Sequence, residues 1–223
     1  MKFPMLVPCR RCGNQMTVET TGDERYPDVQ CSNCQLPIWI IDDGTVSSRV
    51  FCRAEVELGR NDWSVAIILS AMSVECELAY LYSKWKALDA NLAPNEVKPI
   101  QVELWEEEFR KLSTISRRLD AVSDLLAGCT FDSFLALRPD VLSPLSKTHP
   151  QLGTSPKDFF IKELFWRRNK ILHSGKVQFG SSEAAACVKT AMTMIQIIRL
   201  IDRDRYLRLE EESKARRASG KRA

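Results

Sequence analysis

The sequence predicts a mainly α-helical protein in which a small β-rich segment precedes an up-and-down bundle of four long helices. Two observations support this fold class. From about Asn61 onward, where Asn61 or Asp62 can cap a helix, apolar residues recur every three or four positions, which is the spacing of amphipathic helices. Before that point, short apolar runs alternate with turn-forming residues and with two close pairs of cysteines. The 223 residues are enough for one medium domain and one small one.

The two cysteine pairs have the spacing of a tetrahedral zinc site. Two residues separate the cysteines of each pair, and residues 13–30 lie between the pairs. Because four thiolates fill the coordination shell of Zn²⁺ without water, we expect a structural site with about one zinc per chain. The alternatives are a chance pattern or a redox dithiol. The four expected ligands are Cys9, Cys12, Cys31 and Cys34.

The cysteine segment resembles a zinc ribbon. Residues 7–13 and 29–35 are similar to its two knuckles. Three strands are expected around them, at 16–18, at 38–41 and, after the hairpin turn Asp43-Gly44, at 46–51. So few apolar residues do not make a stable core alone, so the metal would supply the missing folding energy.

Long apolar stripes define the helices of the second part. They cover residues 63–88, 105–126, 159–173 and 184–207, and a short helix is expected at 131–137. The third long helix has a clear start, because Ser155 can cap it, Pro156 fits its first turn and Asp158 complements the helix dipole. Gly128 is expected to end the second helix.

The composition is typical of a soluble globular protein, with 44% hydrophobic and 27% charged residues. The formal net charge is only +3, so affinity for nucleic acid would have to come from local patches. No uninterrupted apolar run reaches the roughly 18 to 20 residues that span a bilayer, and residues 1–8 are too short and proline-interrupted for a secretory signal. We therefore expect a cytoplasmic protein without a membrane span.

A second motif lies near the end of the third long helix. Arg168 and His173 are five residues apart, and Asn169 and His173 are four apart and hence on one helix face. By itself this spacing is a weak indication of function. The structural alternative is that His173 complements the negative end of the helix and that Arg168 is a surface charge.

In this context the chain resembles the HEPN superfamily over about residues 55–212. The domains of that superfamily are helical bundles with an R-x4-6-H motif, in which a polar residue, often Asn, follows the Arg. Arg168, Asn169 and His173 match this pattern. The resemblance implies a metal-independent endoribonuclease, or a non-catalytic relative that binds RNA or nucleotides. It also implies a homodimer that brings two such motifs together in a cleft.

The side chains of the motif suit RNA cleavage by attack of the 2′-hydroxyl. His173 can take the proton from that hydroxyl or give one to the leaving 5′-oxygen. Arg168 can stabilise the negative charge of the phosphorane, and Asn169 can orient the imidazole or hold the phosphate. Residues 62–78 resemble the first core helix of the superfamily, and Glu75 in their middle would bind or steer Arg168.

The predicted organisation is a zinc ribbon in residues 1–53, a HEPN-like bundle in residues 54–212 and a basic, disordered tail in residues 213–223. Our preferred interpretation is an RNase of stress response or defence, in which the ribbon selects the RNA or a protein partner. The alternatives are a non-enzymatic adaptor, whose bundle dimerises and whose ribbon binds protein or nucleic acid, and a nucleotide-sensing regulator. The tail would add an RNA attraction that weakens with salt.

Overall fold

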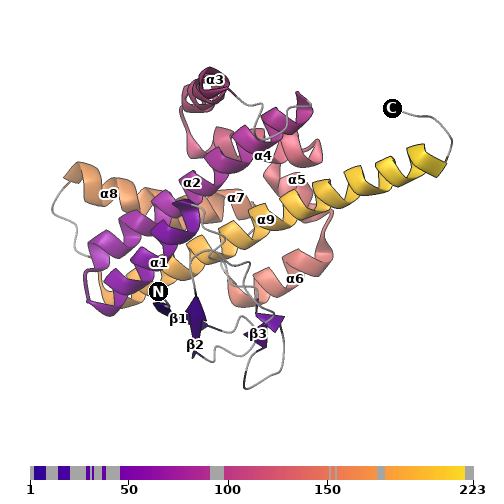
Figure 1. Ribbon diagram of the computed structural model, residues 1–223. Helices are drawn as coiled ribbons and strands as arrows, with labels where there is room; N and C mark the ends of the chain where they lie inside the picture. The colour runs from indigo at the N-terminus through magenta and orange to yellow at the C-terminus, as the bar shows by residue number, and fades with distance from the viewer. Residues whose placement is uncertain are drawn as a thin grey trace. The chain divides into compact units, whose positions relative to one another are not determined.

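A computed structural model describes residues 3–8, 15–20, 29–30, 32, 37–38, 46–90, 98–150, 152–153, 155–174 and 179–218. The chain divides into two compact units, Met1–Arg49 and Val50–Ala223. Every regular element described in the second unit is a helix (Figure 1). The predicted fold class, mainly α-helical, is therefore confirmed.

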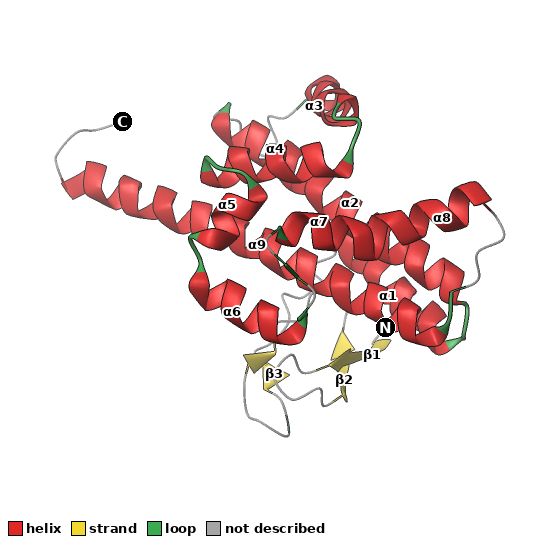
Figure 2. Ribbon diagram, turned by 180° about the vertical axis from the view of Figure 1, so that it is seen from behind, coloured by secondary structure: helices red, strands yellow, loops and turns green. Residues whose placement is uncertain are grey.

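Up to residue 38, the described part of the first unit contains two short antiparallel strand pairs, drawn in yellow in Figure 2. One pair consists of β1 (Phe3–Pro8) and β2 (Gln15–Thr20), and the other of β3 (Val29–Gln30) and β4 (Pro37–Ile38). The four cysteines predicted to bind zinc, Cys9, Cys12, Cys31 and Cys34, lie outside the described residues. The structure therefore leaves the zinc ribbon as a prediction.

The strand predicted at residues 46–51 is wrong, because these residues begin helix α1 (Val46–Gly59). Phe51, Ala54 and Glu57 are buried at a spacing of three, which is a helical and not an alternating pattern. The short run Val46–Phe51 does not distinguish these two periods by itself. The helix crosses residue 53, where the sequence placed a domain boundary, and the division into compact units falls after Arg49.

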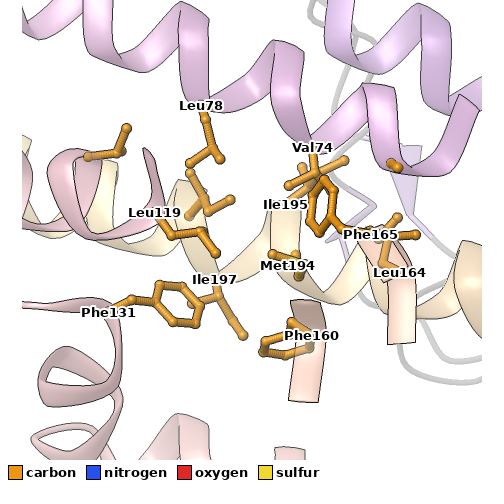
Figure 3. Close-up of a cluster of buried hydrophobic side chains, with 14 of the residues drawn as sticks. Val74, Leu78, Leu119, Phe131, Phe160, Leu164, Phe165, Met194, Ile195 and Ile197 are labelled. Carbon is orange, nitrogen blue, oxygen red and sulfur yellow. The ribbon is translucent and has the colours of Figure 1, made fainter. Parts of the chain in front are cut away.

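Helices α2 (Trp63–Asp89) and α9 (Ser181–Ala218) pack along each other and supply much of the core of the second unit. Figure 3 shows Val74 and Leu78 of α2 in one cluster with Met194 and Ile195 of α9, and all four side chains are buried. Burying a side chain of this size contributes about 1.5 to 3 kcal/mol relative to exposing it. The apolar stripes of the sequence therefore mark the core-facing sides of both helices.

Helix α9 continues further than predicted. It ends at Ala218, so residues 213–218 of the predicted disordered tail are helical. This stretch consists largely of Lys, Arg and Ala, which are strong helix formers.

The second predicted helix is divided into α3 (Pro99–Lys111) and α4 (Ile115–Ala127), which corrects the prediction of four long helices. Thr114 caps α4 by accepting a hydrogen bond from the backbone N–H of Arg117 (3.3 Å). Gly128 ends α4 as expected, in a left-handed conformation with φ of 71°. The short helix α5 (Phe131–Ala136) was predicted, whereas α6 (Pro139–Thr148) was not.

The third predicted helix is present as a continuous run of α7 (Pro156–Phe160), η1 (Ile161–Trp166) and α8 (Arg167–Ser174). Ser155 caps it by accepting from the backbone N–H of Asp158 (3.2 Å). The middle segment, η1, is a π-helix, in which hydrogen bonds join residues five apart. This segment changes the rotation of α8 about the helix axis relative to an uninterrupted α-helix.

Helices α2 and α9 are each long and apolar enough to cross a membrane by length and composition. About half of each apolar window is buried inside the structure, 50% in α2 and 56% in α9. The core helices of a soluble bundle have the same property, so this is weak evidence for a span. The cytoplasmic location stays a prediction.

Candidate functional site

Arg168 of α8 is joined to α2 by an ion pair with Glu75. Its Nη2 donates to Glu75 Oε1 at 2.9 Å, and the guanidinium lies 5.8 Å from the ring centroid of Phe165. The contact expected between Glu75 and Arg168 is therefore present. The contact fixes the direction of the Arg168 side chain, because the carboxylate holds one end of the guanidinium and the phenyl ring supports its face.

A second arginine, Arg118 of α4, approaches the same carboxylate. Its Nη1 lies 3.6 Å from Glu75 Oε1, its Nε donates to the carbonyl of Leu112 (2.9 Å), and its guanidinium lies 5.2 Å from the ring centroid of Phe109. Helices α2, α4 and α8 thus bring two cations and one anion together. We call Glu75, Arg118 and Arg168 the arginine–glutamate cluster; its formal charge is +1.

The side chains of the arginine–glutamate cluster are partly exposed to solvent. The side chains of both arginines are 22% exposed, and that of Glu75 is 26% exposed. Nε of Arg168 is buried and has no hydrogen-bond partner among the described residues. A cluster with excess positive charge and partly exposed guanidinium groups is suited to binding an oxyanion such as phosphate.

His173 and Asn169 lie on a different side of α8 from Arg168. Both are exposed, and His173 is in the last turn of the helix. At about 100° per residue, Arg168 and His173 are separated by about 140° around the helix axis, and Asn169 and His173 by about 40°. The structure therefore brings Arg168 and Glu75 together, but within one chain it does not turn His173 towards Arg168. The position of His173 also suits the structural alternative, a cation at a helix C-terminus.

Charged residues next to the arginine–glutamate cluster in the sequence bind other partners. Glu77 is buried and bonded through both oxygens to Arg199 of α9. Arg167 pairs with Glu163 (2.7 Å), and its Nη1 is 3.6 Å from the sulfur of Cys187. Arg167 and Arg168 are thus adjacent in sequence but bound to different helices.

No described thiol of this region has the properties of a nucleophile. Burial raises the pKa of Cys76, and the charges of Glu75 and Glu77 raise it further. Burial likewise raises the pKa of Cys187. Both thiols are therefore protonated near neutral pH, which disfavours nucleophilic attack by either sulfur.

A cavity of about 390 Å³ offers a second candidate site, lined by residues of α5, α9 and the end of α4. Two of its arginines contact the protein: Arg138 pairs with Asp204, and Arg208 donates to the carbonyl of Leu126 (2.8 Å). The first contact joins the start of α6 to α9, and the second joins α9 to the end of α4. The arginine–glutamate cluster contains Arg168 of the sequence motif, and we therefore take it as the candidate site.

The sequence identified Arg168, Asn169, His173 and Glu75 but not Arg118. Arg118 follows another arginine in an ordinary amphipathic helix, and its spacing relative to the motif carries no information. Only the packing of α4 against α2 shows that it reaches Glu75.

The described residues contain no group of three or more His, Cys, Asp or Glu side chains that could hold a metal ion. No family model matches the chain, and neither a protein of curated function nor a solved structure is significantly similar to it. The resemblance to the HEPN superfamily therefore rests on the pattern of Arg168, Asn169 and His173 and on the order of the helices.

Proposed function

We propose that this protein is a metal-independent endoribonuclease of the HEPN type that acts as a homodimer. The observation that supports it most directly is the ion pair between Arg168 and Glu75. This ion pair fixes the direction of the Arg168 side chain, and Asn169 and His173 are exposed on the same short helix, α8. A fixed cation and an accessible acid–base group are the two components that this reaction needs.

In the proposed reaction, the 2′-hydroxyl of RNA attacks the adjacent phosphorus. His173 accepts the hydroxyl proton or protonates the departing 5′-oxygen, and water or the second histidine of a dimer serves the other step. The products are a 2′,3′-cyclic phosphate and a 5′-hydroxyl end. Arg168 stabilises the phosphorane through the N–H groups that it does not use to bind Glu75.

The angle between the two side chains supports the proposed homodimer. Because Arg168 and His173 are about 140° apart around α8, one copy presents them in different directions. A cleft shared by two copies would supply an arginine and a histidine to the same phosphate. The exposed side chain of Leu172, 53% accessible in the single chain, would gain apolar burial in such an interface.

The N-terminal residues complete the proposal. Four thiolates, from Cys9, Cys12, Cys31 and Cys34, would hold one structural zinc, and the ribbon so formed would select RNA or a protein partner. We place the protein in the cytoplasm, in stress response or defence.

The test is cleavage of a fluorescent single-stranded RNA in EDTA, with zinc retention measured in parallel. The wild type should cleave and leave cyclic-phosphate or 3′-phosphate ends, and His173→Ala should abolish cleavage without changing the helical content or the dimer. Arg168→Ala should lower cleavage by about 10²- to 10³-fold, as when one oxyanion-stabilising group is removed.

Arg167→Ala is the matched control, because this arginine is adjacent in sequence but contacts Glu163 and Cys187. It should retain cleavage at temperatures at which it is folded. Absence of cleavage by the wild type, or equal cleavage by His173→Ala, would overturn the proposal that the protein is a ribonuclease. RNA binding by a dimer that does not cleave would favour the adaptor.

A further inference from the structure

An exposed tryptophan lies directly before the two arginines of the motif. Trp166, the last residue of η1, is 51% exposed, although tryptophan is usually largely buried. The Nζ atom of Lys170 lies 5.3 Å from the centroid of its ring. The other tryptophans in the described residues, Trp63, Trp85 and Trp105, are buried or half-buried. Trp166 is thus an exception among them.

Four exposed residues share one face of this helix. Trp166, Asn169, Lys170 and His173 occupy positions i, i+3, i+4 and i+7, which fall within an arc of about 100°. We call these four residues the α8 face. The opposite side of the helix carries Arg168, which binds Glu75 and so turns the α8 face towards solvent.

The composition of the α8 face matches the parts of one nucleotide unit. An indole ring stacks on a base, and an ammonium group beside it meets the adjoining phosphate. The amide of Asn169 offers both hydrogen-bond donors and an acceptor, and the imidazole of His173 can transfer a proton. Trp166 and His173 are about 10 Å apart along the helix axis, so a base on the indole would leave a neighbouring phosphate near the histidine.

We infer that the α8 face binds single-stranded RNA, with Trp166 stacked on a base and Lys170 beside a phosphate next to the scissile bond. This inference rests on the proposed function and specifies its substrate. A single strand is required because the faces of bases are covered by stacking in a duplex. A protein partner fits less well, since the core of a protein interface needs adjoining apolar groups and Trp166 is the one apolar side chain of this face.

Binding is tested with a 2′-O-methyl single-stranded oligonucleotide, which lacks the attacking hydroxyl and so separates binding from cleavage. Fluorescence anisotropy should show Trp166→Ala weakening binding by about 5- to 150-fold, the effect of losing one stacked base. Trp166→Phe should recover part of the loss. Lys170→Ala should reduce the slope of log K against log salt by about 0.7.

Tyr206→Ala is the matched control, because Tyr206 is also an exposed aromatic side chain (59%) but lies on α9. Its affinity should equal that of the wild type. The inference is overturned if Trp166→Ala binds like the wild type, if a duplex binds as tightly as the single strand, or if Trp166→Ala dissociates the dimer, which would make the face a protein interface.

The two proposals fail separately. If cleavage depends on His173 but Trp166→Ala binds RNA like the wild type, the ribonuclease proposal stands and the role of Trp166 in binding is wrong. If RNA binding depends on Trp166 but the wild type does not cleave, the role of Trp166 stands and the ribonuclease proposal is wrong.

Discussion

Replacing Glu75 or Glu77 by alanine distinguishes the proposed site from the scaffold, since these two carboxylates of α2 have different partners. Glu75 is 26% exposed and binds Arg168 at 2.9 Å. Glu77 is 2% exposed and accepts hydrogen bonds from Nε and Nη2 of Arg199 at 2.7 and 2.9 Å. The first carboxylate orients a motif side chain, and the second fastens α2 to α9.

The expected stability losses differ by several fold. Removing one partner of a buried ion pair costs about 3 to 5 kcal/mol, and the partial exposure of Arg199 places Glu77→Ala near the lower end, at about 3 kcal/mol. Removing a partner from a partly exposed pair costs about 0.5 to 1 kcal/mol, which applies to Glu75→Ala. At about 2 to 4 °C per kcal/mol, Tm should fall by about 6 to 12 °C for Glu77→Ala and by no more than about 4 °C for Glu75→Ala.

Activity should show the opposite order. Without Glu75 the Arg168 side chain loses its fixed direction, so RNA cleavage should fall by about tenfold or more. Glu77→Ala should cleave normally at temperatures well below its Tm. Thermal unfolding followed by circular dichroism, together with cleavage rates, measures both effects. Equal destabilisation by the two substitutions, or loss of cleavage in Glu77→Ala alone, would show that the two carboxylates do not have these separate roles.

Three further predictions concern stability and metal. Burial lowers the pKa of His149, so the folded state binds a proton at this residue less tightly than the unfolded chain does. The free energy of unfolding should therefore be unaffected by His149 above about pH 6.5 and should fall as the pH drops below that value. His149→Leu should reduce this fall, as measured by urea unfolding. An identical pH dependence in the variant would contradict this. Gly128→Ala should lower Tm by about 2 to 8 °C because φ is 71°, although no atom lies within 4 Å of the added Cβ; an unchanged Tm would exclude this strain. Metal analysis should find about one zinc per chain. Cys9→Ser should lose this zinc and keep the helical content of residues 54–212. A wild-type chain without zinc, or a general loss of helix in Cys9→Ser, would contradict the predicted zinc ribbon.

The helices could be predicted where local sequence and core packing agree. Ser155 begins a helix through its hydroxyl, and Gly128 ends one through a positive φ, as the residue types indicated. The break between α3 and α4 was missed because the apolar stripe continues through it from Phe109 to Leu119. The chain is held there by the hydrogen bond from Arg118 to the carbonyl of Leu112, which periodicity does not reveal.

The site was predictable only in part, for a similar reason. Spacing within one helix identified Arg168, Asn169 and His173. The contribution of Arg118 depends on how α4 packs against α2, and the exposure of Trp166 depends on which side of α8 faces inward. The π-helix η1 also affects that rotation, and no residue pattern in the sequence indicates it.

The most direct test of the central claim is the initial rate of single-stranded RNA cleavage in EDTA by the wild type and by His173→Ala, both shown to be folded and dimeric. The wild type should cleave and leave 2′,3′-cyclic phosphate ends, and His173→Ala should not cleave. Equal rates for the two proteins, or no cleavage by the wild type, would contradict it.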